Sequence, residues 1–188
     1  DGAEIAELMG VFVDAQGTVA PEPIVVTGTD NGIVGVTVAP LNDGNFIIAW
    51  QDNATETDPS KIINKDGNLI AENFFNKSSD NYDGVFNENV AFASFNDGSF
   101  LATRTSSTAM SSPSHFSSST IYFQRFDEFG NKIESEIDAS RGHAGWVEES
   151  IAVTLSENSF FIIWRAEGTE YFSKLFAQKF DESGNPVG

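Results

Sequence analysis

One turn-forming segment recurs along the chain, and this repetition limits the available folds more than any other feature. The glycine of the turn occurs in four copies, at Gly17, Gly67, Gly130 and Gly184. A second turn upstream of it occurs in three copies, at Gly44, Gly98 and Asn158. Self-similarity at a period of about 40–60 residues is typical of stacked or radially repeated units. The sequence therefore predicts an array of similar units rather than one irregular core.

Each full copy contains four short apolar segments separated by turns, which predicts four β-strands. In the first copy, Val34, Val36 and Val38 alternate with other residues and give the two-residue period of a strand. The Asn42-Asp43-Gly44 segment then predicts a tight hairpin. Four short strands joined by hairpins are the sequence form of a β-propeller blade. A β-sandwich also has evenly spaced short strands and is the alternative, but it has no reason to repeat the same turn positions.

We expect one all-β domain over residues 1–188, a β-propeller-like array of about three and a half four-stranded repeats. Residues 1–32 form a half repeat with a third and a fourth strand, 33–84 form repeat 1, and 85–146 form repeat 2. Residues 147–188 form repeat 3, which is expected to lack its fourth strand. The Ser-rich insert 105–119 in repeat 2 is expected to be a mobile loop, because it has little apolar surface to bury.

The composition excludes several classes of function. The chain has 28 acidic and 10 basic residues, so its formal net charge is −18. Such a surface repels nucleic acid and anionic lipid, because phosphate contacts require Lys and Arg. There is no Cys, which excludes disulfides and thiolate metal sites, and no apolar run is long enough to span a membrane. The chain starts at Asp1 without a Met, and we expect a processed or truncated product whose export signal has been removed.

Two longer motifs surround the turns. The first, L-x-D-G-x-F-x-x-x-W, consists of Leu41, Asp43, Gly44, Phe46 and Trp50. The second, Q-[RK]-F-D-x-x-G-N, occurs twice and begins at Gln124 and at Gln178. Together they resemble the propeller-like repeats of large secreted bacterial proteins of the RTX or haemolysin type, and the resemblance covers nearly the whole chain. It implies an extracellular or cell-surface setting and an adhesive or scaffolding role, and it brings no catalytic residues. The glycine-rich nonapeptides that bind calcium in that family are absent, so the resemblance does not imply calcium.

One acidic segment between repeats 1 and 2 is the best candidate for a metal site. Asp80 and Asp83 lie within it, and Glu88 follows. Hard cations such as Ca²⁺ take six to eight oxygen ligands in a bent loop. Calcium is therefore the cofactor that these acids would favour, although they lack EF-hand spacing and a solvated loop is the default interpretation. A weaker candidate consists of Asp52, Glu56 and Asp58.

Two asparagines match the N-glycosylation sequon. Asn53 and Asn76 both lie in predicted loops, where a glycan would fit. The two histidines, His115 and His143, also lie in predicted loops, with no carboxylate partner fixed by the sequence. Acid–base catalysis needs a carboxylate beside the histidine in a cleft, and a zinc site needs a His-rich cluster, which is lacking. We therefore expect no catalytic residues and no enzyme.

Two kinds of residue repeat with the turns and are expected to be structural. Trp50 and Trp164 hold the same position, which Arg104 occupies in the second copy. Repetition favours core packing of these tryptophans over sugar stacking. Asp127 and Asp181 begin the downstream turn, where a carboxylate accepts hydrogen bonds from the backbone two residues on. We expect them to form the turn rather than to bind a metal.

Three hypotheses on function follow. The first is a non-catalytic extracellular structural or adhesive module that self-assembles through incomplete terminal blades, by strand addition between chains or as a dimer. The second is a carbohydrate-binding propeller whose exposed aromatic residues, Tyr82, Phe116 or Trp146, contact a surface polysaccharide. The third is a polysaccharide hydrolase or lyase. Fold alone does not separate them, because function lies in sites carried on a fold.

Overall fold

The protein is described here by a computed structural model. It describes residues 6–29, 32–41, 44–52, 59–74, 90–108, 118–140, 146–156, 159–167 and 173–188. Every regular element in these ranges is a β-strand, which confirms the expected all-β class. Among the same residues there is no helix with the length and hydropathy needed to cross a membrane.

The strands form four antiparallel sheets. The half blade is the two-stranded sheet of β1 (Ala6–Gly10) and β2 (Ile24–Thr29). Blade 1 contains β3 (Ile33–Pro40), β4 (Phe46–Asp52), β5 (Ser60–Ile63) and β6 (Leu69–Glu72). Blade 2 contains β7 (Ala91–Ser94), β8 (Phe100–Thr108), β9 (Ser118–Phe126) and β10 (Ile137–Asp138). Blade 3 contains β11 (Trp146–Ser156), β12 (Ser159–Glu167), β13 (Ser173–Asp181) and β14 (Pro186–Val187).

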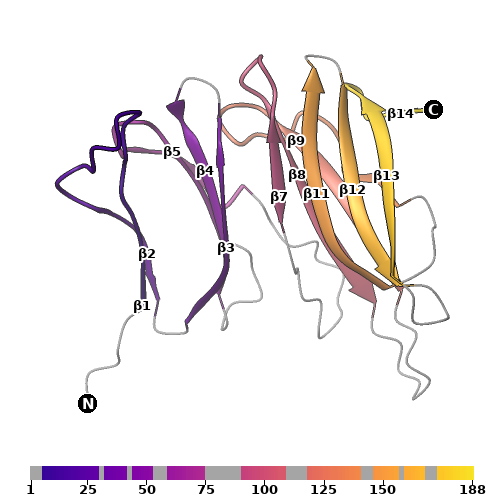
Figure 1. Cartoon of the computed structure of the whole chain (residues 1–188), viewed down its shortest axis with the longest axis horizontal. Coiled ribbons are helices and arrows are strands. Elements are labelled where there is room, and N and C mark those ends of the chain that lie inside the picture. The colour runs from indigo at the N-terminus through magenta and orange to yellow at the C-terminus, as the bar shows by residue number, and fades with distance from the viewer. Residues whose placement is uncertain are drawn as a thin grey trace.

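The four sheets lie side by side and pack face to face, so the fold is a propeller-like array rather than a two-sheet sandwich. Each four-stranded sheet keeps its strands in chain order, as tight hairpins require. Figure 1 shows the half blade at one end of the long axis and blade 3 at the other. The two ends of the array therefore do not meet within one molecule.

Two expectations about strands are wrong. Blade 3 does not lack its fourth strand, because β14 pairs with β13 through Lys179 opposite Val187 and Phe180 opposite Pro186. A proline fits this strand, since an edge strand needs backbone donors on one side alone. The insert 105–119 is not wholly a loop either, because β8 and β9 pair as far as Thr108 opposite Ser118. Backbone hydrogen bonds extend this hairpin although its side chains are polar; residues 109–117 lie outside the described residues.

The downstream turn has the same geometry in all four copies. In the half blade, Asp14 Oδ1 accepts hydrogen bonds from the backbone N–H groups of Gln16 and Thr18, at 2.9 and 2.8 Å. Gly17 N–H donates to the Asp14 carbonyl at 2.9 Å. The residues that replace Asp14 in the other three turns are Asn64, Asp127 and Asp181. The φ angles of the four turn glycines lie between 75° and 84°, a region in which Gly has no steric penalty. The turn-forming role expected of the two Phe-Asp carboxylates is confirmed.

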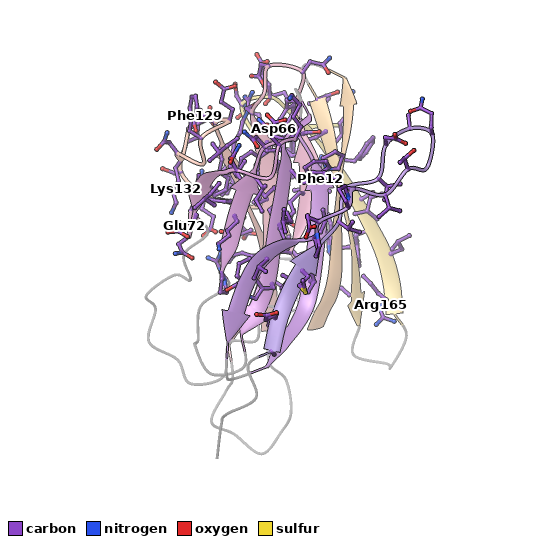
Figure 2. The ribbon with its side chains drawn as sticks, turned by 90° about the vertical axis from the view of Figure 1, so that its left-hand side faces the viewer. Phe12, Asp66, Glu72, Phe129, Lys132 and Arg165 are labelled. Atoms are coloured by element: carbon purple, nitrogen blue, oxygen red, sulfur yellow. The ribbon has the colours of Figure 1, made fainter. Side chains whose placement is uncertain are left out.

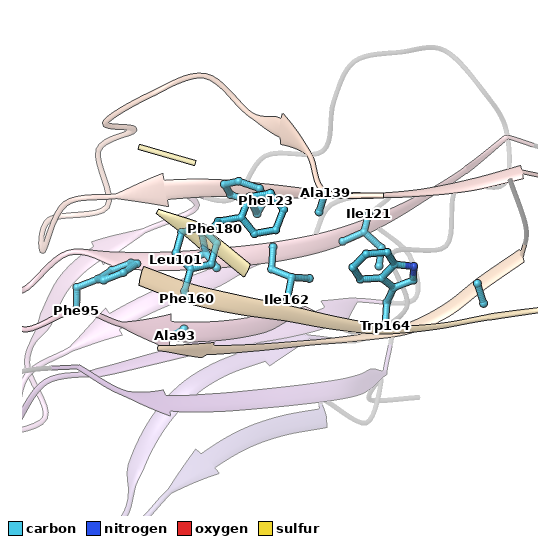
Figure 3. Close-up of a cluster of buried hydrophobic side chains, with 11 residues drawn as sticks. Ala93, Phe95, Leu101, Ile121, Phe123, Ala139, Phe160, Ile162, Trp164 and Phe180 are labelled. Carbon is cyan, nitrogen blue, oxygen red and sulfur yellow. The ribbon is translucent and has the colours of Figure 1, made fainter. Parts of the chain in front are cut away.

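Apolar clusters join each blade to the next, because successive side chains of a strand point to opposite faces. The cluster between blades 2 and 3 is rich in phenylalanine, and Figure 3 shows Trp164 within it beside Ile121. Trp50 lies in the cluster between the half blade and blade 1. Both indoles are 4% exposed, which confirms that they pack in the core. A third cluster joins blades 1 and 2, where Phe100 stacks on Phe126 with ring centroids 5.2 Å apart.

Candidate functional site

Most of the residues proposed from sequence as sites lie outside the described residues. These are the calcium candidates Asp80, Asp83 and Glu88, the sequon residues Asn53 and Asn76, and Glu56, Asp58, His115, His143, Tyr82 and Phe116. Asp52 and Trp146 lie in β4 and β11, but their side chains are outside the described set. In the part of the chain that is described, no group of three or more His, Asp or Glu side chains lies close enough to hold a metal. The sequence-based sites therefore stay predictions.

Arg104 in β8 forms the most buried ion pair among the described residues. Its Nε donates to Glu136 Oε1 and its Nη2 donates to Glu136 Oε2, both at 2.6 Å. The guanidinium also lies over the ring of Tyr122, 4.6 Å from the centroid. Paired, two-point contacts of this kind neutralise a buried guanidinium. The arrangement replaces the tryptophan of the other blades with a polar packing unit, which is a structural role rather than a reactive centre.

Arg125 in β9 fastens blade 2 to the turn of blade 3. Its Nη2 donates to Asp97 Oδ2 at 2.9 Å, and its Nη1 donates to the backbone carbonyl of Glu182 at 3.1 Å. Partial burial raises the pKa of the Asp97 carboxyl, but hydrogen bonds from Ser99 and the charge of Arg125 outweigh this, and the pKa is lowered. Asp97 therefore stays ionised, and the contact fixes the spacing between two blades.

The outer face of the half blade is apolar and exposed. This N-face consists of Met9, Val11, Val13, Val19 and Val25, each 49–59% exposed. Figure 2 views the molecule from the end at which the half blade lies. Met9 lies opposite Val25, and Val13 lies opposite Val19, so the pairs share one face. The positions that correspond to Val13, four residues before each turn glycine, are Ile63, Phe126 and Phe180, which are 5%, 1% and 0% exposed. At the Val13 position, the preceding blade covers this face in every other copy; at the Val19 position it does not, because the equivalent Leu69 of blade 1 is 52% exposed.

The outer face of blade 3 is the counterpart of the N-face. This C-face consists of Phe161, Ile163, Leu175, Ala177 and Val187, which the strand register places on one side of the sheet. Leu175 is 76% exposed, whereas Ile121, at the same position in blade 2, is 0% exposed. Phe161 is partly exposed, whereas the equivalent Leu101 is fully buried by blade 3. The C-face thus corresponds to the face that each internal blade presents to the blade after it.

The two end faces were not predicted from the sequence. A signal was present, because alignment of the turn glycines places Val13 in register with Phe126 and Phe180. That alignment shows that these positions are apolar in all copies. It does not show which copy lies at an end of the array, and this decides whether the side chain is covered.

No family model and no curated protein matches the chain. Among solved structures, it is similar to a GH43 endo-arabinanase from Bacillus licheniformis, with a TM-score of 0.34 and 10% sequence identity. The similarity covers 100% of this chain and 94% of that chain. Similarity at this level does not transfer an activity to the protein described here.

Proposed function

We propose that the protein is a non-catalytic structural or adhesive module of the cell surface or extracellular space that assembles end to end with further copies of itself. In this arrangement, the N-face of one copy packs on the C-face of the next. The observation that supports it is that Val13 and Leu175, which are exposed on the two end faces, hold the positions of side chains that are buried at internal blade interfaces, such as Phe126 and Ile121. The contact between copies would therefore repeat one that the chain already makes within itself.

The exposed apolar area is sufficient for a weak, reversible contact. Fully burying a Val, Leu or Ile side chain contributes about 1.5–3 kcal/mol relative to leaving it exposed. The N-face side chains are already about half covered, so each would contribute about half of that. With Leu175 and Val187 of the C-face, which are 76% and 44% exposed, seven such side chains together give about 5–10 kcal/mol, while association costs about 4–15 kcal/mol. Assembly is therefore expected to depend on protein concentration.

Charge favours unlike faces over like faces. Glu7 is exposed on the N-face, two residues before Met9, and Lys179 lies on the C-face opposite Val187. Arg165 is exposed on the C-face opposite Leu175. Two C-faces would bring like charges together, whereas an N-face and a C-face bring opposite charges together. The overall charge of −18 opposes any self-association, so salt should strengthen it by screening.

Face-to-face stacking replaces strand addition at the end of blade 3. The sequence favoured an N-terminal strand that adds to the open edge of a neighbour's last sheet; β14 pairs with Lys179 and Phe180 at that edge, whereas stacking would bury the exposed apolar side chains of the end faces. A head-to-tail contact between unlike faces is heterologous, so it closes into a ring when the rotation permits and otherwise grows into a filament.

Analytical ultracentrifugation of the whole chain and of two face variants tests the proposal. We expect the mass of the wild-type chain to rise with concentration, and Val13→Asp and Leu175→Asp to stay monomeric. A mixture of the two variants should form a dimer that grows no further, because each variant blocks a different face. Ile133→Asp is the matched control, since Ile133 is 45% exposed in blade 2 and belongs to neither face. A monomeric wild-type chain at high concentration, or equal disruption by the control, would refute the proposal.

The other two hypotheses receive less support from the described residues. Trp50 and Trp164 are buried, so neither indole is available for stacking on a sugar. The side chains of Tyr82, Phe116 and Trp146, on which the sugar-binding hypothesis rests, lie outside the described set. A glycan array and an activity screen on polysaccharides would test binding and hydrolysis directly.

A further inference from the structure

An apolar side chain of one blade presses on the turn glycine of the next blade at each internal interface. A Cβ atom built on Gly67 would lie 3.0 Å from Ile24 Cγ2 of the half blade. A Cβ atom on Gly130 would lie 3.0 Å from Phe74 Cβ. A Cβ atom on Gly184 would overlap Ile137. The lack of a side chain at the glycine is therefore what lets each blade approach the next one.

These three side chains, which we call the knobs, occupy one position of the repeat. Ile24 follows Gly17 by seven residues, and Phe74 and Ile137 follow Gly67 and Gly130 by the same interval. Each knob is also packed into an interface cluster. Phe74 is the largest and lies edge-on to Phe100 and Phe126, with centroid distances of 5.6 and 5.7 Å. The knob is thus a regular part of the packing contact between neighbouring blades.

The turn of the half blade has the same form but no knob. Gly17 has a φ of 84°, and none of the described residues would lie within 4 Å of a Cβ atom placed on it. Val13 and Val19, which flank this turn on the N-face, are each 57% exposed. Counted by the same interval from Gly184, the knob position of blade 3 is 191.

We infer that the Gly17 turn is a socket on the N-face for the knob of a docking blade. The occupant is a β-blade of this same repeat type that carries Ile or Phe seven residues after its own turn glycine. The inference rests on the proposed end-to-end stacking and names the side chain that selects the partner. A blade with a small or polar residue at that position would dock on the valines of the N-face but leave the socket empty.

A C-terminal extension of the whole chain supplies the knob and tests the inference. The six residues Ser135–Ser140 of blade 2, copied after Gly188, place an isoleucine at position 191. The control extension has alanine at that position. Burial of one isoleucine side chain corresponds to an association that is about tenfold to a hundredfold tighter. We expect sedimentation equilibrium to give that ratio between the dissociation constants of the control and the extended chain.

A substitution at Gly17 should remove the increase in affinity that the isoleucine extension gives. Asn tolerates a positive φ, so Gly17→Asn keeps the turn while its side chain fills the socket. We expect the variant to melt close to the wild type and to bind both extensions equally. If the isoleucine and alanine extensions give equal affinities in chains that keep Gly17, the inference is wrong. Loss of association in Val13→Asp would still support the proposed stacking in that case. If neither extended chain associates, both the inference and the proposed stacking are wrong.

Discussion

Replacement of Trp164 by Ala should destabilise the protein by about 3–5 kcal/mol, the usual cost of removing a large buried aromatic side chain. The indole is 4% exposed and stacks on Phe176 with ring centroids 5.7 Å apart and planes at 14°. Its removal leaves a cavity between blades 2 and 3 that the surrounding sheets cannot collapse to fill. Urea unfolding followed by far-UV circular dichroism measures the loss as a shift of the midpoint at constant slope.

Trp164→Phe separates packing from hydrogen bonding at the same position. The indole Nε1 has no hydrogen-bond partner among the described residues, so its replacement by an aromatic carbon loses no bond there. We expect this variant to lose about 1–2 kcal/mol of unfolding free energy, which is less than the alanine effect. Leu175→Ala is the exposed control and should change stability by less than about 0.5 kcal/mol. A loss below about 1 kcal/mol for Trp164→Ala would show that the indole is not in the core.

Three further predictions concern the turns and the buried ion pair. Gly17→Ala should lower the free energy of unfolding by about 1–2 kcal/mol, because alanine is strained at a positive φ. Gly184→Ala should lower it by about 1–3 kcal/mol more, because its Cβ would overlap a knob. Thermal melts of the two variants measure the difference. Glu136→Gln should lower the free energy of unfolding by about 1–2 kcal/mol, because it leaves the buried Arg104 without its charged partner. The stability of the variant should depend less on salt than that of the wild type, because Glu136 is partly exposed. Urea unfolding at two salt concentrations measures both effects. Backbone hydrogen bonds from Asn185 lower the pKa of Asp181, so its contribution to stability is present above the ordinary value of 3.8 and is lost as pH falls through the lowered pKa. Asp181→Asn imitates the Asn64 turn and should reduce this loss between pH 5 and pH 2, while equal acid sensitivity of variant and wild type would contradict the assignment.

Local features of the sequence were sufficient for the repeat and for most of the strands. The turn glycines have a local cause, because the positive φ and the hydrogen bonds to Asp14 or its counterparts lie within five residues. The burial of Trp50 and Trp164 followed from their recurrence at one strand position. These predictions needed no knowledge of which blade lies beside which.

Features that depend on contacts between distant segments were not predicted. Val13 and Phe126 hold the same position, and only the presence of a preceding blade makes one exposed and the other buried. Strand β14 begins with a proline, and its pairing with Phe180 depends on its position at a sheet edge. The calcium and glycosylation candidates were selected from residue type in polar segments, without any cross-strand pattern to support them, and they lie outside the described residues.

The constant seven-residue interval between turn glycine and knob has a consequence for how such genes change length. Both halves of the contact, a turn glycine and a knob, occur together in the half blade, blade 1 and blade 2. A duplicate of one of these repeats would therefore fit its neighbours at once, and the loss of one would bring two compatible partners together. Removal of residues 75–137, for example, would bring the Phe74 side chain next to the Gly184 turn, in place of Ile137. Unequal recombination between repeats can therefore lengthen or shorten the array by whole units without any compensating substitution at the new junction.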